Sequence, residues 1–157
     1  MRQPLKAGVS NASQIFDEMI GNFDAHVKNF SLLYETATAP CLSPTYDIVA
    51  YSGYLAGEGN GLKFFPDSKE REKLLPAIVR RLANFLGIPE KALSKVIADT
   101  VSTAVAKWPK AIRRSELSRL QKINLLTHFK HNPSVEALRK RKKAACLRGR
   151  PDLELPD

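Results

Sequence analysis

The segment Asp24-Ala-His-Val-Lys-Asn29 carries the side chains best suited to chemistry. Asp24 and Asn29 are separated by four residues, which is the spacing in the catalytic loop of protein kinases. There the aspartate orients the attacking hydroxyl group and accepts its proton, and the asparagine binds a magnesium ion near the phosphates. The D-x-x-x-x-N spacing alone is weak evidence, because Asp24 could be a turn residue and Asn29 a cap at the start of a strand.

A second carboxylate, Asp47, follows Asn29 by 18 residues. A kinase holds a further metal-binding aspartate beyond its catalytic loop, because metal ions must bridge the transferring phosphate. Lys28 could neutralise charge that develops on that phosphate, and His26 could shape the loop by hydrogen bonding. The alternative interpretation makes Asp47 an ordinary loop carboxylate. The conjunction favours phosphoryl transfer with Asp24 as base and magnesium at Asn29 and Asp47.

Short elements must position these side chains. Apolar residues at helical spacing predict a helix just before the loop, and two short apolar runs after it predict a β-hairpin. The predicted elements are, in order, a helix over 11–23 that Gly21 and Asn22 end, a loop over 23–29, a strand over 30–34, a turn-rich break over 36–44 and a strand over 46–49. The hairpin would carry Asp47 back towards Asn29.

The second half of the chain is predicted to be helical, so the fold class is mainly α. Gly87 is a C-terminal stop signal, and Trp108-Pro109 is expected to break the pattern. The predicted helices cover 69–86 (apolar face Leu74, Leu75, Ile78, Leu82 and Phe85), 89–106 (apolar face Leu93, Val96, Ile97, Val101 and Val105), 115–130 and a basic 134–147. Segment 53–61 is a glycine-rich loop, and 153–157 is expected to be disordered.

Composition limits the class of protein. The chain has 157 residues, of which 43% are hydrophobic and 26% charged, and this length suits one domain or one lobe of a larger protein. No apolar run approaches the roughly 18 residues that a membrane-spanning helix requires. Cys41 and Cys146 lie far apart and lack metal-ligand spacing, so we expect a cytoplasmic protein with reduced thiols.

The net charge of +9 favours phosphate, nucleic acid or an acidic protein as a partner. Much of the excess lies in Arg113-Arg114 and in the run at 139–143. A solvated helix face or tail is the simpler interpretation of that run. Nucleic-acid binding is the other, although no DNA-reading motif is present and no aromatic residues are interleaved with the basic run.

Other candidate sites carry less weight. His128 and His131 have the spacing of two ligands on one helix face, but no third ligand is near in the sequence, so they are expected to be surface histidines. Trp108 is expected to lie in the core. No G-x-S-x-G motif marks a serine nucleophile.

One family matches the loop and its neighbour. Ile20-Gly-Asn-Phe-Asp-Ala-His-Val-Lys-Asn-Phe-Ser-Leu-Leu-Tyr34, with Leu42-Ser-Pro-Thr-Tyr-Asp-Ile48, resembles the C-terminal domain of the HipA family, the serine/threonine kinase toxins of bacterial toxin–antitoxin pairs. The family pattern is I-G-N-x-D-x-H-x-K-N followed by L-x-P-x-Y-D, and almost every position agrees. The resemblance extends over about 10–130.

The resemblance implies the helical C-lobe of a kinase-like fold. It implies that Asp24 is the catalytic base, that His26 and Lys28 belong with it to the catalytic residues, and that Asn29 and Asp47 bind magnesium and so the nucleotide. The implied cofactors are Mg²⁺ and ATP, and the implied substrate is a serine or threonine hydroxyl on a protein. The implied partner is a HipB-like helix-turn-helix antitoxin, with DNA bound weakly or only through it.

The expected domains are a flexible 1–10, a C-lobe over 11–132 and a basic helix and tail over 133–157. Within the lobe, the catalytic loop is 22–31, the metal-binding segment 42–50 and the helical bundle 69–131.

No nucleotide-covering loop precedes Asp24, and the glycines at 53–61 follow it, which is the wrong order. We therefore expect a truncated or split form with weak ATP affinity alone, completed by a separate N-lobe chain; the alternative is a non-catalytic antitoxin- or nucleic-acid-binding module.

Overall fold

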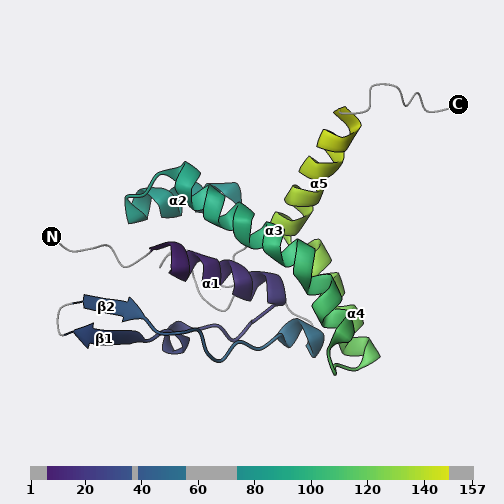
Figure 1. Ribbon diagram of the computed structural model, residues 1–157, viewed down its shortest axis with the longest axis horizontal. Helices are drawn as coiled ribbons and strands as arrows, with labels where there is room; N and C mark the ends of the chain where they lie inside the picture. Colours follow the sequence, from purple (N-terminus) through teal and green to yellow (C-terminus); the bar gives the residue numbers. More distant parts are fainter. Residues whose placement is uncertain (1–6, 37–38, 56–73, 149–157) are drawn as a thin grey trace, which may run out of the picture.

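The computed structural model describes residues 7–36, 39–55 and 74–148 of the chain. Within these residues the fold is mainly helical, with one antiparallel hairpin (Figure 1). This confirms the predicted mainly α class with a short hairpin. The elements are α1 (Ala7–Ile20), the 3₁₀ turn η1 (Val27–Asn29), β1 (Leu32–Thr36), β2 (Ala39–Leu42), the 3₁₀ turn η2 (Tyr51–Gly53), α2 (Pro76–Leu86), α3 (Glu90–Arg114), α4 (Arg119–His131) and α5 (Pro133–Arg148).

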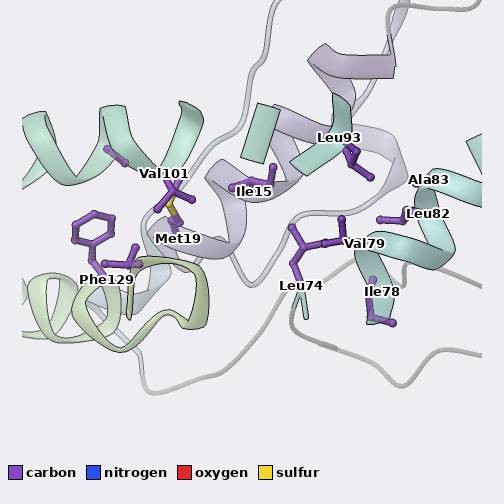
Figure 2. Packing of buried hydrophobic residues seen from close by; sticks show 12 residues of the cluster. Ile15, Met19, Leu74, Ile78, Val79, Leu82, Ala83, Leu93, Val101 and Phe129 are labelled. Carbon is purple, nitrogen blue, oxygen red and sulfur yellow. The ribbon is translucent and has the colours of Figure 1, made fainter. Parts of the chain in front are cut away.

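The hydrophobic core lies where α1 meets the later helices. α1 lies between α3 and the hairpin in Figure 1, and its buried face packs against α3 and α4. Burying one such aliphatic or aromatic side chain contributes about 1.5–3 kcal/mol. Figure 2 labels contributors from the first four helices, among them Ile15 and Met19 of α1, Ile78 and Leu82 of α2, Leu93 and Val101 of α3, and Phe129 of α4.

α1 begins at Ala7, four residues earlier than the predicted start at 11, so the prediction of an unstructured 7–10 is wrong. It ends as the sequence predicts. Gly21 adopts a left-handed φ of 70°, and the Asn22 N–H donates to the Asp17 carbonyl at 2.8 Å. These are the features of a glycine-terminated helix end. They turn the chain sharply into the loop that carries Asp24.

A buried carboxylate ties α1 to two other parts of the fold. Glu18 is 4% exposed. Its two carboxylate oxygens accept from the Leu74 N–H at 3.0 Å and from Asn132 Nδ2 at 3.2 Å. Asn132 Oδ1 in turn accepts from the N–H groups of Ser134 and Val135, which caps α5. Because a buried carboxylate without partners is costly, these bonds fix where α1, α2 and α5 meet.

The hairpin is present, but its second strand was misplaced. β2 lies at Ala39–Leu42, inside the predicted turn-rich break, and pairs with β1 so that Leu32 faces Leu42. The predicted strand at 46–49 is not a strand. Asp47 has a φ of 55°, and a left-handed residue cannot continue an extended strand.

α2 begins at Pro76 rather than at 69. The residue before a proline is driven towards extended backbone, and Leu75 has φ −89° and ψ 161°. Residues 69–73 of the predicted helix lie outside the described residues. Leu74, Ile78 and Leu82 are buried as predicted, whereas Leu75 and Phe85 are exposed. The predicted stop at Gly87 is confirmed by its left-handed conformation.

α3 continues through Trp108-Pro109 to Arg114, so the predicted break there is wrong. A proline inside a helix removes one hydrogen bond, but packing on both sides of it holds this helix together. The Trp108 ring lies edge-on to Phe16 at 4.8 Å and 5.2 Å from the Phe129 ring. Ile112, one turn beyond the proline, is buried. The expectation that Trp108 packs on the core is confirmed.

The last two helices lie close to their predicted positions. α4 begins at Arg119 rather than 115, because Ser118 caps it. The Ser118 hydroxyl accepts from the Gln121 N–H, and the Gln121 side chain accepts from the Ser118 N–H. This reciprocal arrangement is a capping box. α5 spans Pro133–Arg148, so the predicted basic helix is confirmed. The predictions for 1–6, 56–61 and 153–157 lie outside the described residues.

Two glycines at helix ends give a matched test of the turn after α1. A Cβ added at Gly21 would lie 2.5 Å from Ser52 Cβ, whereas one at Gly87 would meet nothing within 4 Å. Both residues have positive φ, so alanine costs about 1–2 kcal/mol of backbone strain at either position. Overpacking at Gly21 adds about 1–3 kcal/mol. Urea unfolding should therefore show a larger loss for Gly21→Ala than for Gly87→Ala, and equal losses would contradict the close approach.

Candidate active site

The loop after α1 is folded by its own backbone. The Ala25 N–H donates to the Asn22 carbonyl at 3.3 Å, and the Asn29 N–H donates to the His26 carbonyl at 2.9 Å. Ala25 is buried, while the side chains of Asp24 and Lys28 on either side of it are exposed. Ala25 therefore packs the loop against the protein, while the side chains of Asp24 and Lys28 remain accessible to solvent.

Asn29 and Asp47 meet across the hairpin. Asn29 Nδ2 donates to Asp47 Oδ2 at 2.7 Å, which brings together two of the residues singled out by the sequence. Asn29 Oδ1 is buried and has no hydrogen-bond partner. An unsatisfied buried acceptor costs about 1–3 kcal/mol, and a cation is one species that would satisfy it. Asp47 is the only non-glycine residue with positive φ in the described part of the chain, and such strain gathers at functional sites.

Tyr46 holds the segment that carries Asp47 against the loop that carries Asp24. Its hydroxyl donates to the Lys28 carbonyl at 2.8 Å. Ser31 Oγ lies 2.7 Å from the same hydroxyl, and it is the donor because the one Tyr46 proton is already used. The sequence placed Tyr46 in a motif but gave it no role. Its position directly before Asp47 was the feature of the sequence that could have indicated a role in placing Asp47.

Tyr51 connects the second 3₁₀ turn to the candidate base. Its hydroxyl donates to Asp24 Oδ2 at 3.4 Å. The negative charge of Asp24 is the main cause that raises the pKa of Tyr51 above its usual value, with smaller contributions from partial desolvation, the hydrogen bond itself and the charge of Asp47. Sequence reasoning missed Tyr51, because nothing in its local pattern indicates that η2 lies beside the loop.

His26 and Lys28 are placed on the loop without side-chain partners. Both side chains are exposed, and neither forms a hydrogen bond or ion pair within the part of the chain that the structure describes. Their backbone carbonyls stabilise the loop instead. The His26 carbonyl accepts from the Asn29 N–H, and the Lys28 carbonyl accepts from the Tyr46 hydroxyl. His26 therefore contributes to the shape of the loop through its backbone carbonyl and not through its side chain, as had been expected.

His128 supports the loop from α4. Its Nε2 lies 3.0 Å from the Glu18 carbonyl oxygen, and its ring is edge-on to Phe23 at 5.6 Å. His128 is half-buried, so its predicted surface position is wrong. His131 is exposed and lies 3.4 Å from Glu136. Across the described residues no three His, Cys, Asp or Glu side chains gather to hold a metal.

The comparisons with known proteins agree with this geometry. A family model described as "HipA-like C-terminal domain" matches residues 11–108. This chain belongs to that family. The resemblance seen in the loop motif is thereby confirmed, and the two motif segments that carry it are the ones joined by the Asn29–Asp47 bond.

Two curated relatives come from Sinorhizobium fredii (strain NBRC 101917 / NGR234). The HipA-like chain is 30% identical to "Putative kinase Y4dM" over 125 residues, which is 80% of this chain and 30% of that protein. It is 32% identical to "Putative kinase Y4mE" over 103 residues, which is 55% of this chain and 24% of that protein. The matched region therefore spans less than a third of the length of either relative.

Cys41 and Cys146 are both exposed and form no disulfide with each other. Among the helices that the structure describes, none combines the length and apolar character needed to cross a membrane.

The contact between Tyr51 and Asp24 predicts a pH-dependent signal. Because Asp24 is the main cause of the raised Tyr51 pKa, Asp24→Asn should lower that pKa towards its usual value near 10. Nuclear magnetic resonance of ¹³C-labelled tyrosine gives the titration curve, and Tyr51→Phe assigns the signal. Asp99→Asn on α3 is the matched control and should leave the curve unchanged. A Tyr51 pKa that does not respond to Asp24→Asn would contradict the contact.

Proposed function

We propose that this chain is the catalytic, magnesium-binding lobe of a serine/threonine protein kinase that transfers the γ-phosphate of ATP to a protein hydroxyl. The observation that supports it most is the Asn29–Asp47 bond, which joins two motif residues 18 positions apart. The family and the names of the two relatives agree with a kinase.

The residues present fit a magnesium ion. Mg²⁺ prefers oxygen ligands and is held by one or two carboxylates together with the phosphates of its substrate. Asp47 supplies a carboxylate, and Asn29 Oδ1 is a buried oxygen without a donor. The pair contains no thiol or imidazole, the ligands that softer metals prefer. When bound, the ion would neutralise charge on the phosphates; Asn29 and Asp47 would hold it.

Asp24 is the proposed base. The hydroxyl oxygen of the acceptor forms a bond to the γ-phosphorus while the bond from that phosphorus to the bridging oxygen of ADP breaks, and Asp24 receives the hydroxyl proton. Tyr51 donates to Asp24 Oδ2, which leaves Oδ1 to face the acceptor. Lys28 is exposed on the same loop and is the proposed source of positive charge near the transferred phosphate. His26 contributes through its backbone carbonyl.

A kinase site also has a side that holds the nucleotide. A kinase needs a loop over the phosphates and a lysine that pairs with them, and the relatives are more than three times as long as the region they share with this chain. We propose that a further segment or a separate N-lobe chain supplies these parts. Large apolar side chains are exposed on the hairpin and η2 side, where such a lobe would pack: Leu32, Leu33, Tyr34, Tyr54 and Leu55.

We also propose a protein partner on the basis of the family. HipA-type kinases pair with a HipB-like helix-turn-helix antitoxin, and we extend this pairing to the present chain on the strength of the family match. A non-catalytic antitoxin-binding module is the alternative. It requires the same fold but no role for Asp24 in chemistry, so an assay of Asp24 separates the two.

The decisive variant is Asp24→Asn, which keeps the shape of the side chain and removes its basicity. With labelled ATP at millimolar concentration and excess magnesium, the chain should transfer phosphate slowly to a serine- or threonine-containing protein. Loss of the base should lower that rate by about 10²–10⁴-fold. Glu116→Gln, at an exposed position on the α3–α4 connection, is the matched control and should retain the rate. Transfer that survives Asp24→Asn unchanged would exclude the mechanism.

A further inference from the structure

The distal half of α5 extends beyond the packed helices. Its first turns are anchored, since Val135 is fully buried and Leu138 packs against the core. From Arg139 to Lys143 every side chain is exposed. In Figure 1 the yellow-green α5 projects away from the other helices, with its far end clear of them.

The cations of α5 divide into two faces. At about 100° per residue, Arg141 shares a face with Ser134, Ala137 and Leu138, and these four residues line a cavity of about 300 Å³ with α2 and α3. The other four cations of the run 139–143 fall within an arc of about 160° on the opposite side. This arc is formed by Arg139, Lys140, Lys142 and Lys143, and we call it the basic face of α5.

No residue within the described part of the chain neutralises the basic face. None of its four side chains forms an ion pair or a hydrogen bond within the described ranges 7–36, 39–55 and 74–148. The acidic residue of α5, Glu136, lies beside His131 instead. Like charges three and four positions apart destabilise a helix by a few tenths of a kcal/mol per pair, as for Arg139 with Lys142 and Lys143. A bound polyanion would relieve this repulsion.

The chemistry of the helix selects among polyanions. A membrane surface requires an apolar stripe opposite the charges, but here that side lines the cavity between helices. Protein interfaces are depleted of lysine at their centre, and three of the four cations are lysines. Single-stranded nucleic acid requires aromatic stacking platforms, and residues 133–148 contain no aromatic side chain.

We propose that the basic face of α5 binds the phosphate backbone of duplex DNA without reading its sequence. B-form DNA has a groove wide enough to admit a helix, whereas the major groove of A-form RNA is too narrow. With four phosphate contacts, the logarithm of the binding constant should fall with the logarithm of salt concentration with a slope of about −3.6. This surface is independent of the candidate active site, so it stands or falls apart from the proposed kinase function.

The test compares two variants with the same net charge. One replaces the basic face (Arg139→Gln, Lys140→Gln, Lys142→Gln, Lys143→Gln), and the other replaces four dispersed exposed cations (Lys91→Gln, Lys107→Gln, Arg113→Gln, Arg119→Gln). Glutamine is a good helix former, and circular dichroism checks that both variants keep the helical content of the unmodified chain. Fluorescence anisotropy with a duplex of about 20 base pairs, between about 50 and 200 mM salt, gives the salt slope.

The basic-face variant should lose binding by at least about 10-fold at the lowest salt, with its salt slope reduced by about 3, while the dispersed variant keeps most of both. Equal losses in the two variants would mean that net charge alone attracts DNA, and would overturn the proposal. So would failure of the unmodified chain to bind at the lowest salt. Equal or tighter binding of an RNA duplex or of poly-glutamate under the same conditions would assign the surface to another partner.

Discussion

The close approach of Ser52 to the last turn of α1 is the contact on which the rest of the site depends. Ser52 Oγ donates to the Ile20 carbonyl at 2.7 Å, and the Ser52 N–H donates to the Gly21 carbonyl at 3.2 Å. Only a residue without a side chain at position 21 leaves room for this contact. It places the segment around η2 beside the loop that leaves α1, so Tyr51 reaches Asp24 and Asp47 reaches Asn29.

The helices hold this junction from the other side. α4 packs on η2, where Asn124 Nδ2 donates to the Gly53 carbonyl at 3.4 Å, and His128 reaches the Glu18 carbonyl. Glu18 then links α1 to the entry of α2 and to the start of α5. The helices therefore support the loop that carries Asp24 from one side. Its polar side chains can remain exposed because small or buried neighbours, such as Ala25, do the packing.

Much of this could be predicted from the sequence, for identifiable reasons. Predictions were correct where neighbouring residues alone determine the structure, as at Gly21 and Gly87, which end helices. The spacing of Asp24, Asn29 and Asp47 also indicated a candidate site, and Asn29 and Asp47 are in contact. The errors arise where distant packing decides. Pro109 stays helical because Trp108 and Ile112 are held by other helices, and Tyr51 faces Asp24 only because Ser52 is bound to α1. The second strand was misplaced because the backbone at Asp47 is left-handed, which no alternation of residue types reveals.

The proposed metal site of Asn29 and Asp47 beside Asp24 is tested most directly by the position of a bound ion. Manganese can replace magnesium at oxygen sites, and it broadens the nuclear magnetic resonance signals of nearby amides. In the ¹⁵N-labelled chain, substoichiometric Mn²⁺ should first broaden the amides around Asn29 and Asp47, excess Mg²⁺ should reverse this, and Asp47→Asn should abolish it. Broadening centred elsewhere, or unchanged by Asp47→Asn, would contradict the account.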